Sequence, residues 1–99
     1  MRDGPNEGLV LSDLTLSAVQ MEATRAHILH GDSSMLYPGH TNDRRNSILV
    51  EEVGEVAREL NDAEIGNRPV DRDKLVKELI QSAAMCLTWV EALEGKNHE

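Results

Sequence analysis

The sequence predicts an all-α protein in which three main helices form an oligomeric helical bundle. Three segments repeat apolar residues at three- and four-residue steps, which is the period of one helix face. Residues typical of helix starts and ends flank each segment. The last segment is apolar on every side, and a chain of 99 residues cannot surround such a helix by itself. We therefore expect a second subunit to complete the bundle.

The first helix is predicted over residues 14–30. Ser12 or Asp13 can accept the free N–H groups at its start, and Gly31 stands where a glycine commonly ends a helix. Its apolar stripe comprises Leu16, Val19, Ala23, Ala26 and Leu29. Residues 31–42 are rich in polar residues, with Gly and Pro among them, and form a loop. An ordered loop of this length often has a function.

The second helix begins at Asn42 or Asp43, either of which can cap it, and continues to about Leu60 or Ala63. Gly54 inside it costs roughly 1 kcal/mol relative to alanine, and a close helix contact is one explanation for it. Residues 65–72 contain Gly, Asn and Pro and form the connection to the next helix.

The third helix is capped by Asp71, runs to about Glu94 and ends at Gly95. Its first turns are charged, but residues 79–93 contain no basic residue and one acidic one, Glu91. Cys86, the sole cysteine, lies in this apolar part, so we expect a buried and unreactive thiol.

Composition excludes several classes of function. The net charge of −8 disfavours binding to the phosphate backbone of DNA or RNA, and two aromatic residues provide no platform for stacking bases. No apolar stretch reaches the ~20 residues of a membrane span, and the N-terminus lacks the apolar core of a signal peptide. We expect a cytoplasmic protein with flexible tails at 1–8 and 96–99 around a single domain at 9–95.

Carboxylates recur on one face of the second helix, at Glu52, Glu55 and Glu59. On the third helix Glu78 and Gln81 stand three residues apart, where that helix becomes fully apolar. If the two helices pack antiparallel, Glu52 and Glu55 can face Glu78. Such a group of oxygen ligands suits a hard cation, Mg²⁺ or alternatively Mn²⁺.

Two simpler interpretations stay open. The acidic faces can be solvated helix surfaces, and Lys74, four residues before Glu78, can neutralise that carboxylate by pairing with it. His27 and His30 have a spacing that can bind Zn²⁺, but without a Cys or third His nearby a surface or cap role is favoured. A ferritin-like di-iron site is disfavoured because no Glu-x-x-His pair occurs.

The segment Glu51-Glu52-Val53-Gly54-Glu55, followed after 22 residues by Glu78-Leu79-Ile80-Gln81, resembles the paired motif EExxE…ExxD of the MazG-like family. Members of this family are all-α nucleoside triphosphate pyrophosphohydrolases. The resemblance extends over roughly residues 12–94 and includes His30-Gly31-Asp32 and the run from Ala83 to Leu93. It implies a MazG-like helical domain.

The resemblance also implies the ligands of Mg²⁺, which would be Glu52, Glu55, Glu78 and the residue at position 81. The family has an aspartate at the last position, whereas this chain has Gln81. A glutamine can coordinate through its carbonyl oxygen but brings no charge. Binding of Mg²⁺ is then expected to be weaker, with hydrolysis slow, altered or lost.

The reaction implied is cleavage of a (deoxy)nucleoside triphosphate between its α and β phosphates, giving the monophosphate and pyrophosphate. Glu51 or Glu55 would act as the base. The nucleoside would lie against the first helix and the 31–42 loop, which could close as a lid. The candidate substrate-binding residues are Arg44, Arg45, Lys74 and Lys77 for the phosphates and Trp89 for the nucleobase.

Each of these basic residues is more often a solvated surface charge, and for Trp89 a role as a core or interface anchor is favoured. The resemblance further implies a homodimer or homotetramer. The alternative function is a catalytically weak or inactive MazG-like protein that binds nucleotide or a protein partner.

Overall fold

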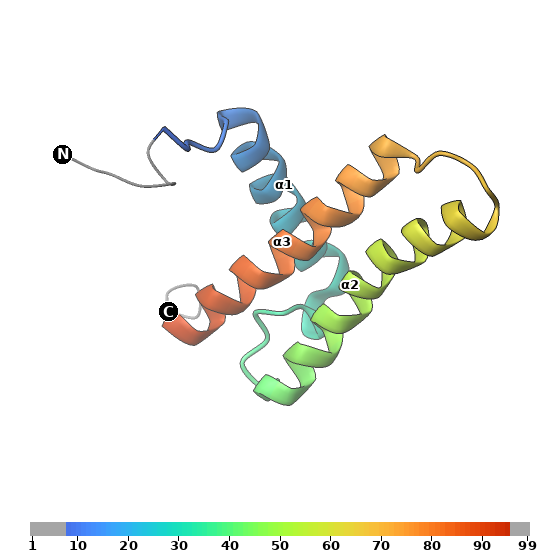
Figure 1. Cartoon of the computed structure of the whole chain (residues 1–99). Helices are drawn as coiled ribbons and strands as arrows, with labels where there is room; N and C mark the ends of the chain where they lie inside the picture. Colours follow the sequence, from blue (N-terminus) through green and yellow to red (C-terminus); the bar gives the residue numbers. More distant parts are fainter. Residues whose placement is uncertain (1–7, 96–99) are drawn as a thin grey trace.

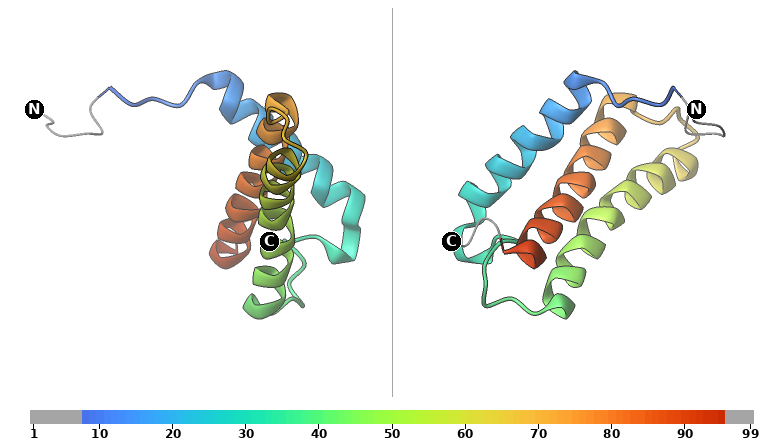
Figure 2. Two further views of the ribbon diagram at one scale, coloured as in Figure 1. Left: turned by 45° about the vertical axis from the view of Figure 1, so that its right-hand side comes forward. Right: turned by 90° about the vertical axis from the view of Figure 1, so that its left-hand side faces the viewer.

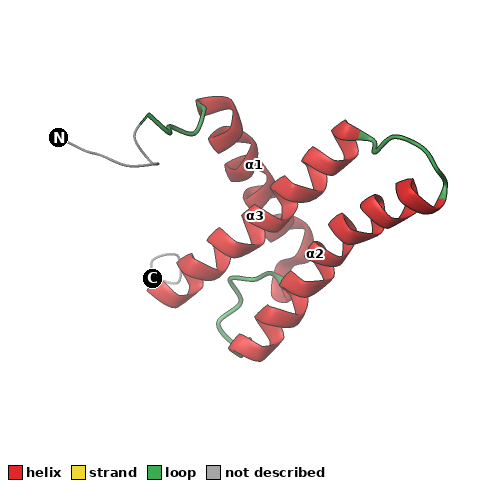
Figure 3. Cartoon of the chain, in the orientation of Figure 1, coloured by secondary structure: helices red, strands yellow, loops and turns green. Residues whose placement is uncertain are grey.

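The computed structural model describes residues 8–95. Within this range the chain contains helices and no strand, so the predicted all-α class is confirmed. The elements are α1 (Asp13–His30), the short 3₁₀ helix η1 (Gly31–Ser33), α2 (Asn42–Ile65) and α3 (Arg72–Glu94) (Figures 1 and 3). Apart from Gly8, the two predicted tails lie outside the described residues. No helix in residues 8–95 has the length and apolar character needed to cross a membrane.

Helix α3 occupies the centre of the arrangement. It packs against both α1 and α2, whereas α1 and α2 make no close backbone contact with each other in the described chain. Helices α2 and α3 form an antiparallel hairpin, and α1 crosses behind α3 in Figure 1. The right-hand view of Figure 2 shows α3 between the other two helices. The shortest dimension of the molecule is 22 Å, about two helix diameters, so α3 is covered on its flanks only.

Most helix ends lie where local sequence predicts them. Ser12 Oγ accepts a 3.1 Å hydrogen bond from the N–H of Thr15, and the Asp71 carboxylate accepts one of 3.1 Å from Lys74. Gly31 and Gly95 follow α1 and α3 with φ of 53° and 74°, in the range that favours glycine.

The predicted start of α2 is wrong by one residue. Thr41, not Asn42 or Asp43, is the cap, because its backbone is extended and its hydroxyl accepts a 3.1 Å hydrogen bond from the N–H of Arg44. Asn42 is already helical, and its side-chain oxygen accepts a 3.0 Å hydrogen bond from Trp89 Nε1 on α3.

The apolar core is small. The buried cluster consists of Val19, Ala26, Met35, Ala84 and Met85, drawn from α1, the loop and α3. Much of the apolar surface of α3 stays exposed, and so does Cys86, whose predicted burial is wrong. The close helix contact expected at Gly54 is also absent from the described structure, where nothing lies within 4 Å of the position of a Cβ atom there.

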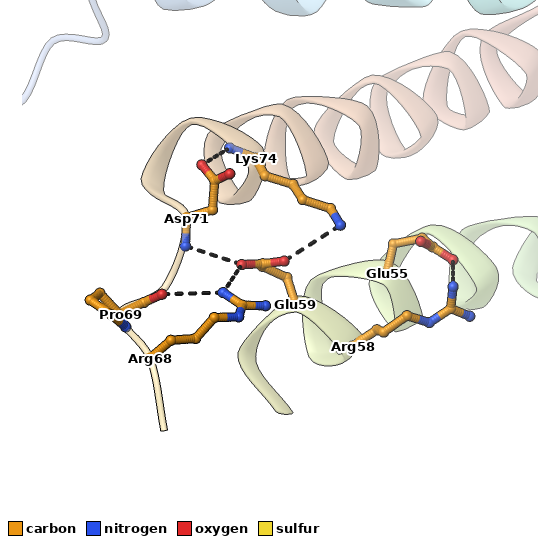
Figure 4. Close-up of polar contacts among 7 residues, drawn as sticks. All are labelled: Glu55, Arg58, Glu59, Arg68, Pro69, Asp71 and Lys74. Carbon is orange, nitrogen blue, oxygen red and sulfur yellow. Dashed lines mark hydrogen bonds and ion pairs between the residues drawn. The ribbon is translucent and has the colours of Figure 1, made fainter. Parts of the chain in front are cut away.

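A buried carboxylate joins the two arms of the hairpin (Figure 4). The side chain of Glu59 on α2 is 2% exposed, and its Oε2 accepts hydrogen bonds from the backbone N–H of Asp71 at 3.1 Å and from Arg68 at 3.3 Å. Its Oε1 lies 3.5 Å from Lys74 Nζ. We call these four residues the Glu59 clasp. The hydrogen bond from Asp71, followed by the hydrogen bond and charge of Arg68 and by the charge of Lys74, holds the pKa of Glu59 below its ordinary value.

Replacement of Glu59 by glutamine is expected to lower the free energy of unfolding at pH 7. Because the pKa of Glu59 is lower in the folded than in the unfolded chain, its ionised form stabilises the fold above pH 4.5, and this contribution is lost as the pH falls through the lower, folded-state value. The difference between the wild type and Glu59→Gln should therefore shrink between pH 7 and pH 3.

Urea denaturation followed by circular dichroism at several pH values measures this difference. Glu64→Gln, at an exposed position of the same helix, is the control and should change little. A Glu59→Gln variant as stable as the wild type at pH 7 would contradict the role of the clasp.

Candidate functional site

One pocket between α2 and α3 collects the predicted metal ligands and bases. We call it the acidic pocket, and its lining consists of Glu51, Glu52, Gly54, Glu55, Arg58, Glu78 and Gln81. The convergence follows from spacing, because residues three apart on a helix share a face and the two helices are antiparallel. The structure thus brings together four carboxylates and one amide that the sequence placed on two separate helices.

Neighbouring carboxylates disfavour the negative charge of Glu52 in this pocket. Glu52 is partly buried, and this burial, together with the negative charges of Glu78, Glu22 and Glu55, raises the pKa of Glu52 above its ordinary value. His30 lowers the pKa of Glu52. Glu78 is itself buried, with 8% of its surface exposed. A cation entering the pocket would remove part of this repulsion.

The side chains do not converge on a single point. Among residues 8–95, no group of three or more His, Cys, Asp or Glu side chains is arranged to hold a metal ion. One reason is visible in Figure 4, where Glu55 Oε2 turns to Arg58 Nη1 at 3.4 Å on the same helix. Mutual repulsion favours such outward rotamers when no cation lies between the carboxylates.

A second pocket adjoins the first and shares Glu51 and Glu52 with it. This loop pocket has a volume of about 180 Å³ and lies among α1, the 31–42 loop, α2 and α3. Its polar lining includes His27, His30, Ser33, Ser34, Arg44 and Thr88, and its apolar lining Ala23, Ala26, Met35, Ile48 and Met85. The predicted nucleoside-binding elements, the first helix and the loop, therefore form walls of one pocket.

Hydrogen bonds fix the loop beside this pocket. His27 Nδ1 and Ser34 Oγ lie 2.6 Å apart, and the same hydroxyl accepts a 3.0 Å hydrogen bond from the N–H of Leu36. Buried Arg45 donates from Nε to the carbonyl of Met35 at 2.8 Å and from Nη2 to that of Tyr37 at 2.9 Å. In this structure the Arg45 guanidinium is thus occupied in holding the loop against α2.

The other predicted substrate contacts are dispersed. Arg44 lines the loop pocket, whereas Lys74, Lys77 and Trp89 lie outside both pockets. Lys74 belongs to the Glu59 clasp, so it pairs with Glu59 and not with Glu78 as the simpler interpretation has it. Trp89 is partly buried against the core and bonded to Asn42.

The sequence reasoning missed an ion pair that α1 brings to the site. Arg25 binds Glu22 through two hydrogen bonds, of 2.9 and 2.6 Å, which lower the pKa of Glu22 and raise that of Arg25. The charge of Glu52 raises the pKa of Arg25 further, as expected for a guanidinium near the acidic pocket. The three-residue spacing of the pair is visible in the sequence, but its position beside Glu52 depends on how α1 crosses α3.

No protein-family model, curated protein or solved structure matches the chain.

Glu52→Gln is expected to raise the melting temperature of the metal-free protein at pH 7. The pKa of Glu52 is higher in the folded than in the unfolded chain, so its ionisation destabilises the fold as the pH rises above 4.5 through the folded-state value. At pH 4 the carboxylate is mostly protonated in both states, so the gain should nearly disappear.

Differential scanning calorimetry in a chelating buffer at pH 4 and pH 7 measures the effect. Glu64→Gln again serves as the control for removing one negative charge from α2. A gain of the same size at both pH values would show that repulsion within the acidic pocket is not its cause.

Proposed function

We propose that this protein is a Mg²⁺-dependent nucleotide pyrophosphohydrolase of the MazG-like kind, which converts (deoxy)nucleoside triphosphates to monophosphates and pyrophosphate. The observation that carries the proposal is the acidic pocket, where Glu51, Glu52, Glu55, Glu78 and Gln81 meet and adjoin a second pocket. The proposal includes a cytoplasmic homo-oligomer, with free nucleotides and not nucleic-acid polymers as substrates.

The donor atoms of the acidic pocket fit a hard cation, since its carboxylates and amide offer oxygen ligands. The residues that would hold Mg²⁺, or Mn²⁺ in its place, are Glu52, Glu55, Glu78 and Gln81. When bound, the ion would neutralise phosphate oxygens and lower the pKa of a bound water. To reach the ion, the Glu55 carboxylate would have to break its ion pair with Arg58. This costs little, because such an exposed ion pair contributes at most about 1 kcal/mol.

The remaining residues have roles that their positions support. Glu51 lines both pockets, so its carboxylate can accept a proton from a water between the phosphates and the nucleoside; Glu55 is the alternative base. Arg44 can pair with a phosphate oxygen from the loop pocket. At about 180 Å³ this pocket is smaller than the ~300–1,000 Å³ of typical ligand sites. It would therefore enclose the base or sugar and leave the phosphates over the acidic pocket.

Gln81 supports a second candidate, a protein that binds nucleotide without hydrolysing it. In the family motif this position is an aspartate, and the neutral amide leaves the proposed metal site with one negative charge fewer. A binding protein needs the two pockets but not a firmly held metal ion, so the same geometry serves it.

Pyrophosphate release from a panel of nucleoside triphosphates, with and without Mg²⁺ or Mn²⁺, tests the enzyme. We expect metal-dependent release that falls by about a hundredfold or more in Glu55→Gln, since a ligand and potential base is removed. No release from any nucleotide, combined with a higher melting temperature in its presence, would support the binding protein instead. If the nucleotides are not hydrolysed and do not stabilise the protein, both candidates are wrong.

Gln81→Asp distinguishes the two candidates further. We expect it to increase the affinity for Mg²⁺ roughly tenfold, because one more carboxylate ligand joins the site, and to increase turnover. The matched control is Gln81→Asn, which has the same length as aspartate without its charge. Calorimetric titration with Mg²⁺ and the release assay are the measurements, and an unchanged affinity in Gln81→Asp would argue against position 81 as a ligand.

A further inference from the structure

The 31–42 loop forms one wall of the loop pocket. Helices α1 and α2 lie on different flanks of α3, and the right-hand view of Figure 2 shows the loop running from the end of α1 to the start of α2. Ser33, Ser34 and Met35 of this loop line the pocket. Because α1 and α2 make no close backbone contact with each other in the described chain, the position of the loop determines whether the pocket is closed on this side.

Buried groups attach this wall to the helices on both sides. Met35 is 3% exposed and belongs to the apolar core, and Ser34 is equally buried. The Ser34 hydroxyl is bonded to His27 of α1. On the other side, Arg45 of α2 donates hydrogen bonds to the carbonyls of Met35 and Tyr37. Residues 34–37 of the loop are thus attached to α1 and to α2 together.

Arg45 suits this attachment because of its burial and its shape. It is 6% exposed, and the ion pairs among residues 8–95 do not include it. A buried guanidinium without a carboxylate has to satisfy its N–H groups with other oxygens, and here two backbone carbonyls supply them. The planar fork of N–H groups reaches both carbonyls at once. A lysine cannot reproduce this, because its N–H groups all belong to one nitrogen atom.

Two consecutive residues of α2 therefore have different relations to the pocket. Arg44 lines it, whereas Arg45 is not part of its lining and contacts the loop backbone. A ligand in the pocket would meet Ser34 and Met35, and Arg45 helps to set the backbone position of both. Arg45 can affect such a ligand through the loop. The lid movement that the resemblance implies would have to break these contacts with α1 and α2.

We propose that Arg45 is a positioning residue for nucleotide binding, which keeps the 31–42 loop in place as a fixed wall of the loop pocket. This role takes the place of the direct phosphate contact for which Arg45 is a candidate by sequence. A wall that is ordered beforehand spares the ligand the entropic cost of ordering it. The identity of the ligand rests on the proposed function, but the attachment of the loop does not.

The pyrophosphate-release assay separates this role from catalysis. In Arg45→Lys we expect KM to rise about tenfold for the nucleoside triphosphate that the wild type cleaves fastest, because the loop then has to be ordered during binding. The kcat should stay within about twofold, since the proposed metal ligands and bases belong to α2 and α3. The matched control is Arg72→Lys, at an exposed position at the start of α3, which should leave both constants unchanged.

Two ligands that the enzyme does not cleave locate the effect. In titration calorimetry, Arg45→Lys should bind the nucleoside monophosphate product about tenfold more weakly than the wild type does. Inorganic pyrophosphate with Mg²⁺ should bind equally to both proteins, because it has no nucleoside to contact the loop. An equal loss of affinity for both ligands would show that Arg45 does not act through the nucleoside pocket. No loss for either would contradict its role in binding.

Amide hydrogen exchange of the free protein tests the attachment itself. The N–H groups of Tyr37 and His40 donate within the loop to the carbonyls of Ser34 and Tyr37, at 3.0 and 3.1 Å. In Arg45→Lys they should exchange at least about tenfold faster, while the amides around the Glu59 clasp keep their wild-type rates. Unchanged exchange in the loop would show that Arg45 does not fix it. Faster exchange throughout the chain would mean a general loss of stability and no local role.

The two kinds of measurement can fail separately. A wild type that neither binds nor cleaves nucleotides would overturn the proposed function, and the exchange rates would then still show whether Arg45 fixes the loop. A wild type that cleaves nucleotides, with an Arg45→Lys variant of the same KM, would overturn the positioning role and leave the proposed function in place.

Discussion

The Glu59 clasp fixes how α2 and α3 lie against each other. The Glu59 carboxylate is buried, and such a charge is tolerated only when hydrogen bonds and cations surround it, as Asp71, Arg68 and Lys74 do here. A shift by one residue would leave the carboxylate without these partners. Glu55 lies about one helical turn before Glu59, and Lys74 lies one turn before the first α3 residue of the acidic pocket. The register set by the clasp therefore decides which side chains meet in that pocket.

A thin arrangement of helices gives the molecule two unlike sides. Because α1 and α2 cover only the flanks of α3, one side of this helix carries Glu78 and Gln81, which line the acidic pocket. Another side carries Leu79 and Leu87, which stay about half exposed.

The sequence was a good guide where the determining interactions are local. The cap formed by Asp71 needs only nearby residues, and the helical period alone places Glu52 with Glu55, and Glu78 with Gln81, on one face of each helix. That the two pairs line one pocket depends in addition on antiparallel packing, which the sequence analysis contained only as a condition. The start of α2 at Thr41 was missed because three neighbouring polar residues can each cap a helix. Other contacts depend on how the chain reverses and how the helices cross. These are the contacts of Glu59, including its pairing with Lys74, and the position of Glu22 beside the acidic pocket. No pattern within a single helix encodes them.

The Glu59 clasp also has a consequence for the order in which the molecule folds. Glu59 and Asp71 are 12 residues apart, so closing the chain between them loses little conformational entropy, and contacts of such short separation favour fast folding. The lining of the acidic pocket comes entirely from the two arms of this hairpin. We therefore expect its carboxylates to assemble before α1 docks, and the loop pocket, which needs α1, to be completed last.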